Sequence, residues 1–96
     1  MARFVLLATG FEMPTQEIMD AWTKWFESIK DHLIDEGSPF GPGREITHSG
    51  TKDLTRDRGA ITGYTIISAK DMEEAEKIAR GCPIITSMRV YEAMSL

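Results

Sequence analysis

The sequence predicts one ferredoxin-like α+β domain over residues 1–96, in which two helices cover one face of a four-stranded antiparallel sheet. Three observations support this fold class. The chain has 96 residues, which suits a single domain with a modest core. Two segments carry apolar residues at helical spacing, and four others have the apolar runs or alternation typical of strands. In chain order these segments follow the β-α-β-β-α-β pattern.

The first half of the chain predicts a strand followed by a helix. Residues 4–8 are consecutively apolar, which indicates a strand buried on both faces. Thr15 is placed to cap a helix, and Gly37 is a natural C-terminal stop. The apolar stripe of this helix consists of Ile18, Trp22, Trp25, Phe26, Ile29 and Leu33.

The middle of the chain is more polar. Residues 38–43, with two prolines, predict a rigid loop. Residues 44–49 predict a weak strand, with Ile46 and His48 on one face, and its polarity favours the edge of the sheet. Residues 50–59 are charged and turn-rich, which predicts a mobile hairpin connection.

The last third predicts a strand, a helix and a final strand. Residues 61–69 are rich in β-branched and aromatic side chains. Asp71 then caps a second helix, with Glu74 as its capping-box partner. Residues 88–94 alternate sufficiently to form the fourth strand. The second helix has the apolar stripe Met72, Ala75, Ile78 and Ala79, and it ends at Gly81 and Pro83.

The central strands predict a homodimer. Phe4, Leu6 and Ala8 lie on one face of the first strand, and Val5 and Leu7 lie on the other. The helices can bury only one of these faces, so the other would be an exposed apolar patch. A second copy packing sheet face against sheet face would cover it.

Composition excludes several classes of function. The net charge is −4 and no basic run occurs, which argues against binding of nucleic acid. No apolar stretch is long enough to cross a membrane, and the N-terminus does not have the pattern of a signal peptide. Cys82 is the only cysteine, which suits a reducing cytoplasm and predicts a buried structural thiol. No metal-ligand spacing or phosphate-binding glycine pattern is present, so we expect no metal and no cofactor.

Three stretches of the sequence resemble the YCII-related family. Residues 19–46 contain its W-x-x-W-F helix and the acidic-Gly-x-P-F-G-P loop that follows. Residues 61–84 are similar to its strand, helix and G-C-P turn, and residues 90–94 are similar to its V-Y-E strand. The features occur in the family's order over almost the whole chain.

This resemblance implies a fold like that of dimeric α/β barrels, which include small-molecule lyases, isomerases and oxygenases. A dehydrochlorinase acting on a chlorinated aromatic ring is among the characterised relatives. One branch is thought to pair a histidine with an acid on the first helix. The acid would be Asp35, but the histidine position falls near Phe26, which cannot transfer a proton. Residues 58–61 also replace the D-G-P-F turn of other relatives.

His48 is the candidate catalytic residue. It is in phase with Ile46 on the predicted edge strand, so an inward-facing imidazole would act as a general base near neutral pH. The alternative is a surface histidine without a catalytic task. His32, with Asp35 and Glu36 three and four residues further along the predicted helix, forms a second pair by spacing. Such pairs also arise by chance on solvated helix faces.

Four residues are predicted to bind a ligand. Aromatic side chains line many small-molecule pockets, and a phenol or carboxyl group supplies polar anchoring. The alternative for the aromatic residues is packing in the core or at an interface, and for the acid an inward-facing charge at an edge strand. The four are Trp22, Trp25, Tyr64 and Glu92.

Two functions therefore remain open. The first is a small-molecule enzyme that uses acid–base chemistry in a cavity between sheet and helices. The second is a non-catalytic module that binds a small ligand or a partner protein.

Overall fold

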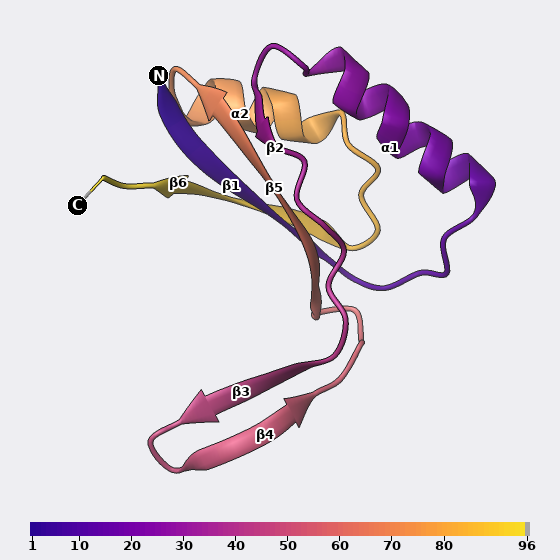
Figure 1. The fold of residues 1–96 in the computed structure, drawn as a ribbon, viewed down its shortest axis with the longest axis vertical. Coiled ribbons are helices and arrows are strands. Elements are labelled where there is room, and N and C mark those ends of the chain that lie inside the picture. Colours follow the sequence, from indigo (N-terminus) through magenta and orange to yellow (C-terminus); the bar gives the residue numbers. More distant parts are fainter. Residues whose placement is uncertain (96) are drawn as a thin grey trace.

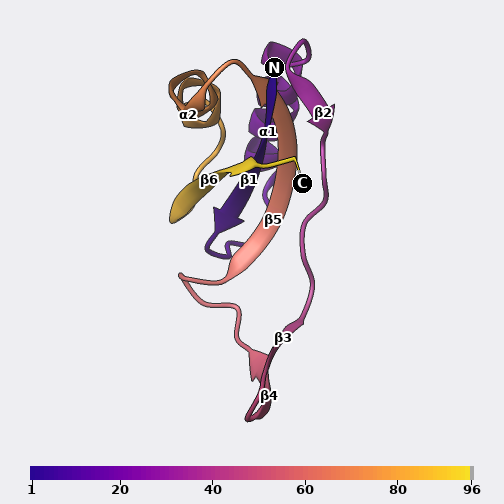
Figure 2. The same cartoon turned by 90° about the vertical axis from the view of Figure 1, so that its left-hand side faces the viewer.

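The computed structural model describes residues 1–95 and confirms the predicted fold class. Four strands form an antiparallel sheet in the order β2-β5-β1-β6, and both helices lie on the same side of it (Figures 1 and 2). A separate two-stranded hairpin projects from the sheet. The elements are β1 (Ala2–Thr9), α1 (Gln16–Ser28), β2 (Leu33–Asp35), β3 (Gly43–Thr47), β4 (Gly50–Leu54), β5 (Ile61–Ala69), α2 (Met72–Arg80) and β6 (Ser87–Ala93).

Strand β1 lies at the centre of the sheet and has two distinct faces. Its residue Phe4 pairs with Ile67 of β5, and Leu6 pairs with Thr65, also of β5. These four side chains face the helices and are buried. Val5 and the other residues of opposite phase point to the helix-free face. The two-faced arrangement predicted for the central strands therefore holds within one subunit.

The second helix forms as predicted. The Asp71 side chain accepts a hydrogen bond from Glu74 N at 2.9 Å, and the Glu74 carboxylate accepts one from Lys70 N at 2.9 Å. Both bonds satisfy backbone donors near the start of the helix. Ala75 and Ala79 are buried against the sheet. Their small side chains allow α2 to contact β5 and β6 closely.

The first helix is shorter than predicted. It ends at Ser28, whose hydroxyl donates to the Trp25 carbonyl oxygen at 2.6 Å, and Leu33 lies in β2 rather than in the helix. Strand β2 pairs with β5 along an edge that would otherwise leave backbone groups unpaired. An apolar residue at position 33 suits either arrangement, because both bury one side of the segment.

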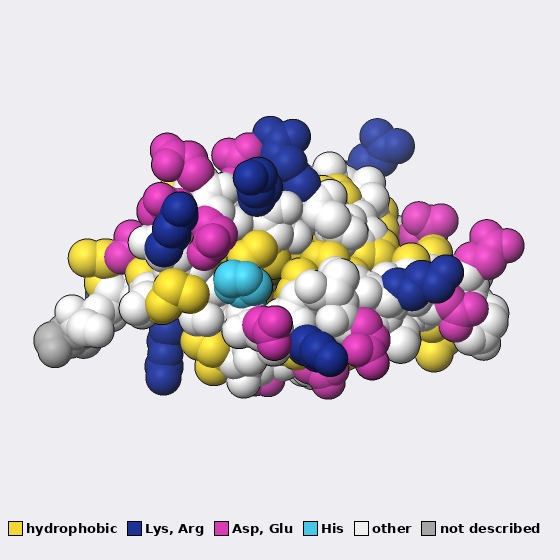
Figure 3. All heavy atoms as spheres, turned by 90° about the horizontal axis from the view of Figure 1, so that it is seen from above, with side chains coloured by type: hydrophobic (Ala, Val, Ile, Leu, Met, Phe, Trp, Pro, Cys, Tyr) yellow, Lys and Arg dark blue, Asp and Glu magenta, His cyan; other side chains and the backbone are white. Residues whose placement is uncertain are grey.

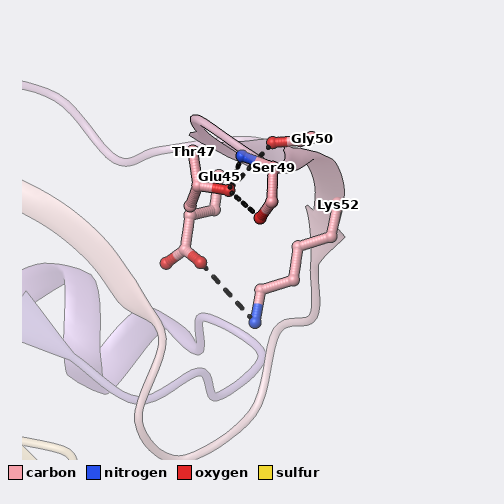
Figure 4. Close-up of polar contacts among 5 residues, drawn as sticks. All are labelled: Glu45, Thr47, Ser49, Gly50 and Lys52. Atoms are coloured by element: carbon pink, nitrogen blue, oxygen red, sulfur yellow. Dashed lines mark hydrogen bonds and ion pairs between the residues drawn. The ribbon is translucent and has the colours of Figure 1, made fainter.

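The prediction that residues 44–49 pair with the edge of the main sheet is also wrong. Residues 43–54 form the β3–β4 hairpin, which pairs with itself and not with the four-stranded sheet. The hairpin residues are all exposed. Arg44 and Asp53 approach to 3.0 Å across the strands, and Lys52 and Glu45 to 3.6 Å (Figure 4). The place expected for this strand is taken by β2.

The hairpin gives the subunit an extended shape. The radius of gyration is 14.4 Å, whereas about 12.5 Å is typical of a compact chain of this length. In Figure 1 the hairpin lies below the sheet and extends toward the side that has no helices. The hairpin and the helix-free face thus border the same open space.

Candidate functional site

A cavity of about 580 Å³ lies between α1 and the helix-facing side of the sheet. It exists because the two helices differ in side-chain size. Helix α2 presents alanines to the sheet, whereas α1 presents large side chains that hold it further away. The apolar wall comprises Leu6, Ala8, Ile18, Met19, Trp22, Phe26 and Met88.

Aromatic rings dominate the α1 side of this cavity. The centroid of the Trp22 ring is 5.8 Å from that of Phe26, and both side chains are half-buried and line the cavity. Trp25 does not line it. Its ring is 4% exposed, and its Nε1 donates to the Ile78 carbonyl oxygen at 3.0 Å. Trp22 is thus placed to meet a ligand, and Trp25 joins α1 to α2.

The cavity opens at a rim formed by four loops, one of which is the segment between α2 and β6 with Ile84 and Ile85. Phe11 and Glu12 come from the segment after β1, Glu36 and Phe40 from the segment after β2, and Arg56 from the segment after β4. Phe11 and Phe40 are 43% and 39% exposed. Large apolar side chains at the rim therefore remain in contact with solvent.

Arg56 connects three of these loops. Its guanidinium carbon is 5.0 Å from the centroid of the Phe11 ring, in cation–π geometry. Its Nη2 donates to the Phe40 carbonyl oxygen at 3.3 Å. Arg56 cannot be predicted as a site residue from the sequence, because it falls in a charged segment typical of a solvated connection. No local pattern in that segment indicates that it returns to a pocket.

Tyr64 lies at the edge of the cavity and is paired with an acid. By strand register it is opposite Leu7, which places its side chain on the helix-free side of β5. The phenol ring stacks on Phe40 with centroids 5.6 Å apart, and its hydroxyl donates to Asp35 Oδ2 at 3.3 Å. The negative charge of Asp35 raises the pKa of Tyr64, so the phenol is a hydrogen-bond donor at neutral pH.

The remaining predicted site residues lie elsewhere. His48 is in the exposed turn of the hairpin and not on an inward-facing strand, so its predicted placement is wrong. Glu92 is exposed on β6 opposite Phe4, whereas the cavity reaches Ala8 at the other end of β1. Neither residue lines the cavity of its own subunit. Their catalytic and ligand-binding roles stay predictions.

The second histidine is also placed differently from its prediction. His32 lies beyond the end of α1, so the helical spacing to Asp35 and Glu36 does not exist. Its Nδ1 is 3.0 Å from the Ser68 carbonyl oxygen, and Ser68 N donates to the His32 carbonyl oxygen at 2.7 Å. These contacts fix the start of β2 against β5.

Cys82 is buried as expected, at 6% exposure, after the end of α2. Burial raises the pKa of its thiol to about 11, so the thiol is protonated and a poor nucleophile at neutral pH. Among residues 1–95 no cluster of three or more histidine, cysteine or acidic side chains is arranged to hold a metal ion. The side chains with polar groups that line the cavity carry carboxylates, hydroxyls and one guanidinium.

The exterior bears mixed charge. On the face seen from above in Figure 3, acidic and basic side chains are interspersed, with apolar patches between them. No helix in the described part of the chain is long and apolar enough to cross a bilayer. A hollow of about 380 Å³ also lies on the hairpin, whose polar contacts are drawn in Figure 4, but every residue lining it is exposed. The cavity beneath α1 is thus the better-enclosed site.

The fold and cavity define an α+β domain of ferredoxin-like topology with a largely apolar cavity beneath α1. One solved structure of similar fold is 5-chloro-2-hydroxyhydroquinone dehydrochlorinase from Burkholderia phenoliruptrix AC1100, in complex with 2,5-dihydroxybenzoquinone. The two chains superpose with a TM-score of 0.58 at 16% sequence identity, over 96% of this chain and 93% of that enzyme. No family model matches the chain, and no curated protein matches it. The chain therefore shares its fold with an enzyme, at an identity that establishes the fold alone.

Proposed function

We propose that this chain is a small-molecule enzyme that binds a largely apolar substrate in the cavity beneath α1 and acts on it by acid–base chemistry. The cavity carries this proposal. Its volume of about 580 Å³ lies within the range of roughly 300–1,000 Å³ common for ligand sites. Its apolar wall and charged rim suit a molecule with one polar end. The fold shared with a dehydrochlorinase supports an enzyme of this kind.

The proton-transferring groups of the cavity are carboxylates. Glu12 and Glu36 are the acidic residues among those that line it, and both lie at the rim. A carboxylate there accepts a proton from a substrate whose apolar part occupies the interior. His48 acts in this chemistry only if the hairpin of one subunit reaches the cavity of another.

The subunit is proposed to work as a homodimer of the YCII-related family in the cytoplasm. Val5, Leu7 and Ile66 lie on the helix-free face and are only partly buried in one subunit, and Tyr91 is 56% exposed there. Packing two such faces together removes this apolar surface from water. The hairpin extends on the same side (Figure 1), where it would contact the second copy.

One observation favours the alternative of a non-catalytic ligand-binding module. The cavity is lined by no histidine and no cysteine among residues 1–95. The candidate bases, Glu12 and Glu36, are carboxylates exposed to solvent. Under this alternative the same cavity holds a ligand without converting it.

A ligand screen followed by substitution separates the two functions. We expect thermal-shift screening to find small planar compounds that stabilise the protein, and some of these to be converted. Glu12→Gln or Glu36→Gln should then lower turnover by about 100-fold or more while binding persists. Glu27→Gln, an exposed change on α1 outside the cavity, is the matched control. Binding without turnover in the wild type supports the module, and absence of any cavity ligand contradicts both functions.

A further inference from the structure

The guanidinium of Arg56 is the one cationic group among the residues that line the cavity. Its position is set by two contacts from different loops, one to the Phe11 ring and one to the Phe40 carbonyl oxygen. Both partners also line the cavity. These contacts hold the charge at the rim, although Arg56, like the rest of its segment, is exposed to solvent.

Arg56 has no carboxylate partner among the described residues. The ion pairs within residues 1–95 join Arg44 to Asp53, Lys52 to Glu45, and Arg80 to Glu76. Glu12 and Glu36 share the rim with Arg56, but neither comes within 4.0 Å of its guanidinium.

The neighbouring acid is also engaged elsewhere. Asp57 accepts hydrogen bonds from the Thr55 hydroxyl and from Gly59 N, each at 2.9 Å. These two bonds close a turn within residues 55–59, so the Asp57 carboxylate already accepts hydrogen bonds from its own segment. Most of the five N–H donors of Arg56 thus remain available to an incoming group.

We propose that Arg56 binds the anionic group of a planar ligand, such as a carboxylate or ionised enol on an aromatic ring, while the ring lies against Trp22 and Phe26. This inference rests on the proposed use of the cavity and adds the chemical class of its ligand. A guanidinium presents parallel donors that match the two oxygens of a carboxylate. The aromatic wall supplies the apolar surface for the ring.

The rim carboxylates limit this ligand to one anionic group beside Arg56. Glu12 and Glu36 repel a second negative charge elsewhere on the rim. They would instead accept a proton or a hydrogen bond from a neutral hydroxyl. The ligand class is therefore narrowed to planar molecules with a single anionic group.

The test compares a planar anion with its neutral isostere. 2-Naphthoate and 2-naphthamide have similar shape and differ in charge, and their binding is followed by calorimetry and by tryptophan fluorescence. We expect naphthoate to bind the wild type about 10- to 100-fold more tightly than naphthamide. Arg56→Gln should abolish this preference, and Arg56→Lys should retain part of it. Arg58→Gln is the matched control, because Arg58 is exposed, two residues away and outside the cavity lining.

The possible outcomes separate this inference from the proposed function. Equal binding of the two compounds by the wild type, or an unchanged preference in Arg56→Gln, overturns the role of Arg56 and leaves the cavity as a ligand site. Binding of neither compound counts against both. A melting temperature for Arg56→Gln equal to that of Arg58→Gln shows that any lost preference does not come from unfolding.

Discussion

The two faces of the central sheet have similar sequences and opposite environments. On β1, Phe4 and Leu6 are fully buried under the helices, whereas the intervening Val5 and the following Leu7 are only partly buried on the other face. The side chains alternate along one strand, so the difference arises from what covers each face. The helix-covered face holds the core and the cavity of one subunit. The helix-free face has apolar surface that stays partly exposed to solvent in one subunit.

The largest effect should follow from opening the helix-covered face. Phe4 is 0% exposed at the centre of the core, so Phe4→Ala should lower the free energy of unfolding by about 3–5 kcal/mol in urea denaturation. Val5→Ala changes the adjacent residue on the other face and should cost clearly less. Equal losses for the two variants would show that the faces do not differ in packing.

The next effect should separate assembly from folding. Val5→Asp places a charge on the proposed subunit interface, and we expect the dimer to dissociate while the fold persists. Light scattering at tens of micromolar should give a dimer for the wild type and a monomer for the variant. Lys24→Asp on the exposed side of α1 is the control and should remain dimeric. A monomeric wild type would refute the homodimer.

A smaller effect should distinguish the core tryptophan from the cavity tryptophan. Trp25→Phe removes the hydrogen bond to the Ile78 carbonyl oxygen, and that loss alone should cost about 0.5–1.5 kcal/mol of stability. Trp22→Phe should change stability less and weaken naphthoate binding more, because Trp22 lines the cavity. The reverse pattern would mean that the two residues have exchanged roles.

The effect that is smallest at neutral pH, and that develops only at alkaline pH, concerns the buried thiol of Cys82 after the end of α2. Burial raises the pKa of Cys82 to about 11 from a usual value near 9.0. The unfolded chain thus loses its proton first as pH rises, so this group lowers stability progressively between about pH 9 and pH 11. Denaturation in that range should show a shallower decline for Cys82→Ala than for the wild type. Parallel declines would contradict the assigned pKa.

Local patterns predicted the elements that local interactions determine. The cap of α2 and the strands β1 and β5 lie where capping residues and apolar runs placed them. The end of α1 cannot be predicted from the local pattern, because Leu33 fits both the helical spacing of α1 and a strand that pairs with β5. That choice depends on a strand that begins at residue 61.

The site was predicted less well than the fold for the same reason. The sequence predicts Trp22 as a ligand-binding candidate because this residue lies on the apolar stripe of an amphipathic helix. Arg56 and Phe11 meet only after the hairpin segment returns to the loop following β1, which no pattern within either segment indicates. The alternation of Ile46 and His48 predicts a strand, and its polarity predicts an edge of the main sheet. In the structure β3 pairs with β4 in a separate hairpin, and His48 lies in the turn between them.

The central position of β1 bears on how the chain is synthesised. Its two neighbours in the sheet are β5 and β6, so β1, at residues 2–9, pairs only with segments that begin at residues 61 and 87. The apolar segment at residues 4–8 therefore stays unpaired during synthesis until residues 61–69 have left the ribosome. The sheet cannot start to form before then, and the nascent segment is a natural target for chaperones in the meantime. A nascent chain arrested at residue 80 should accordingly remain sensitive to protease.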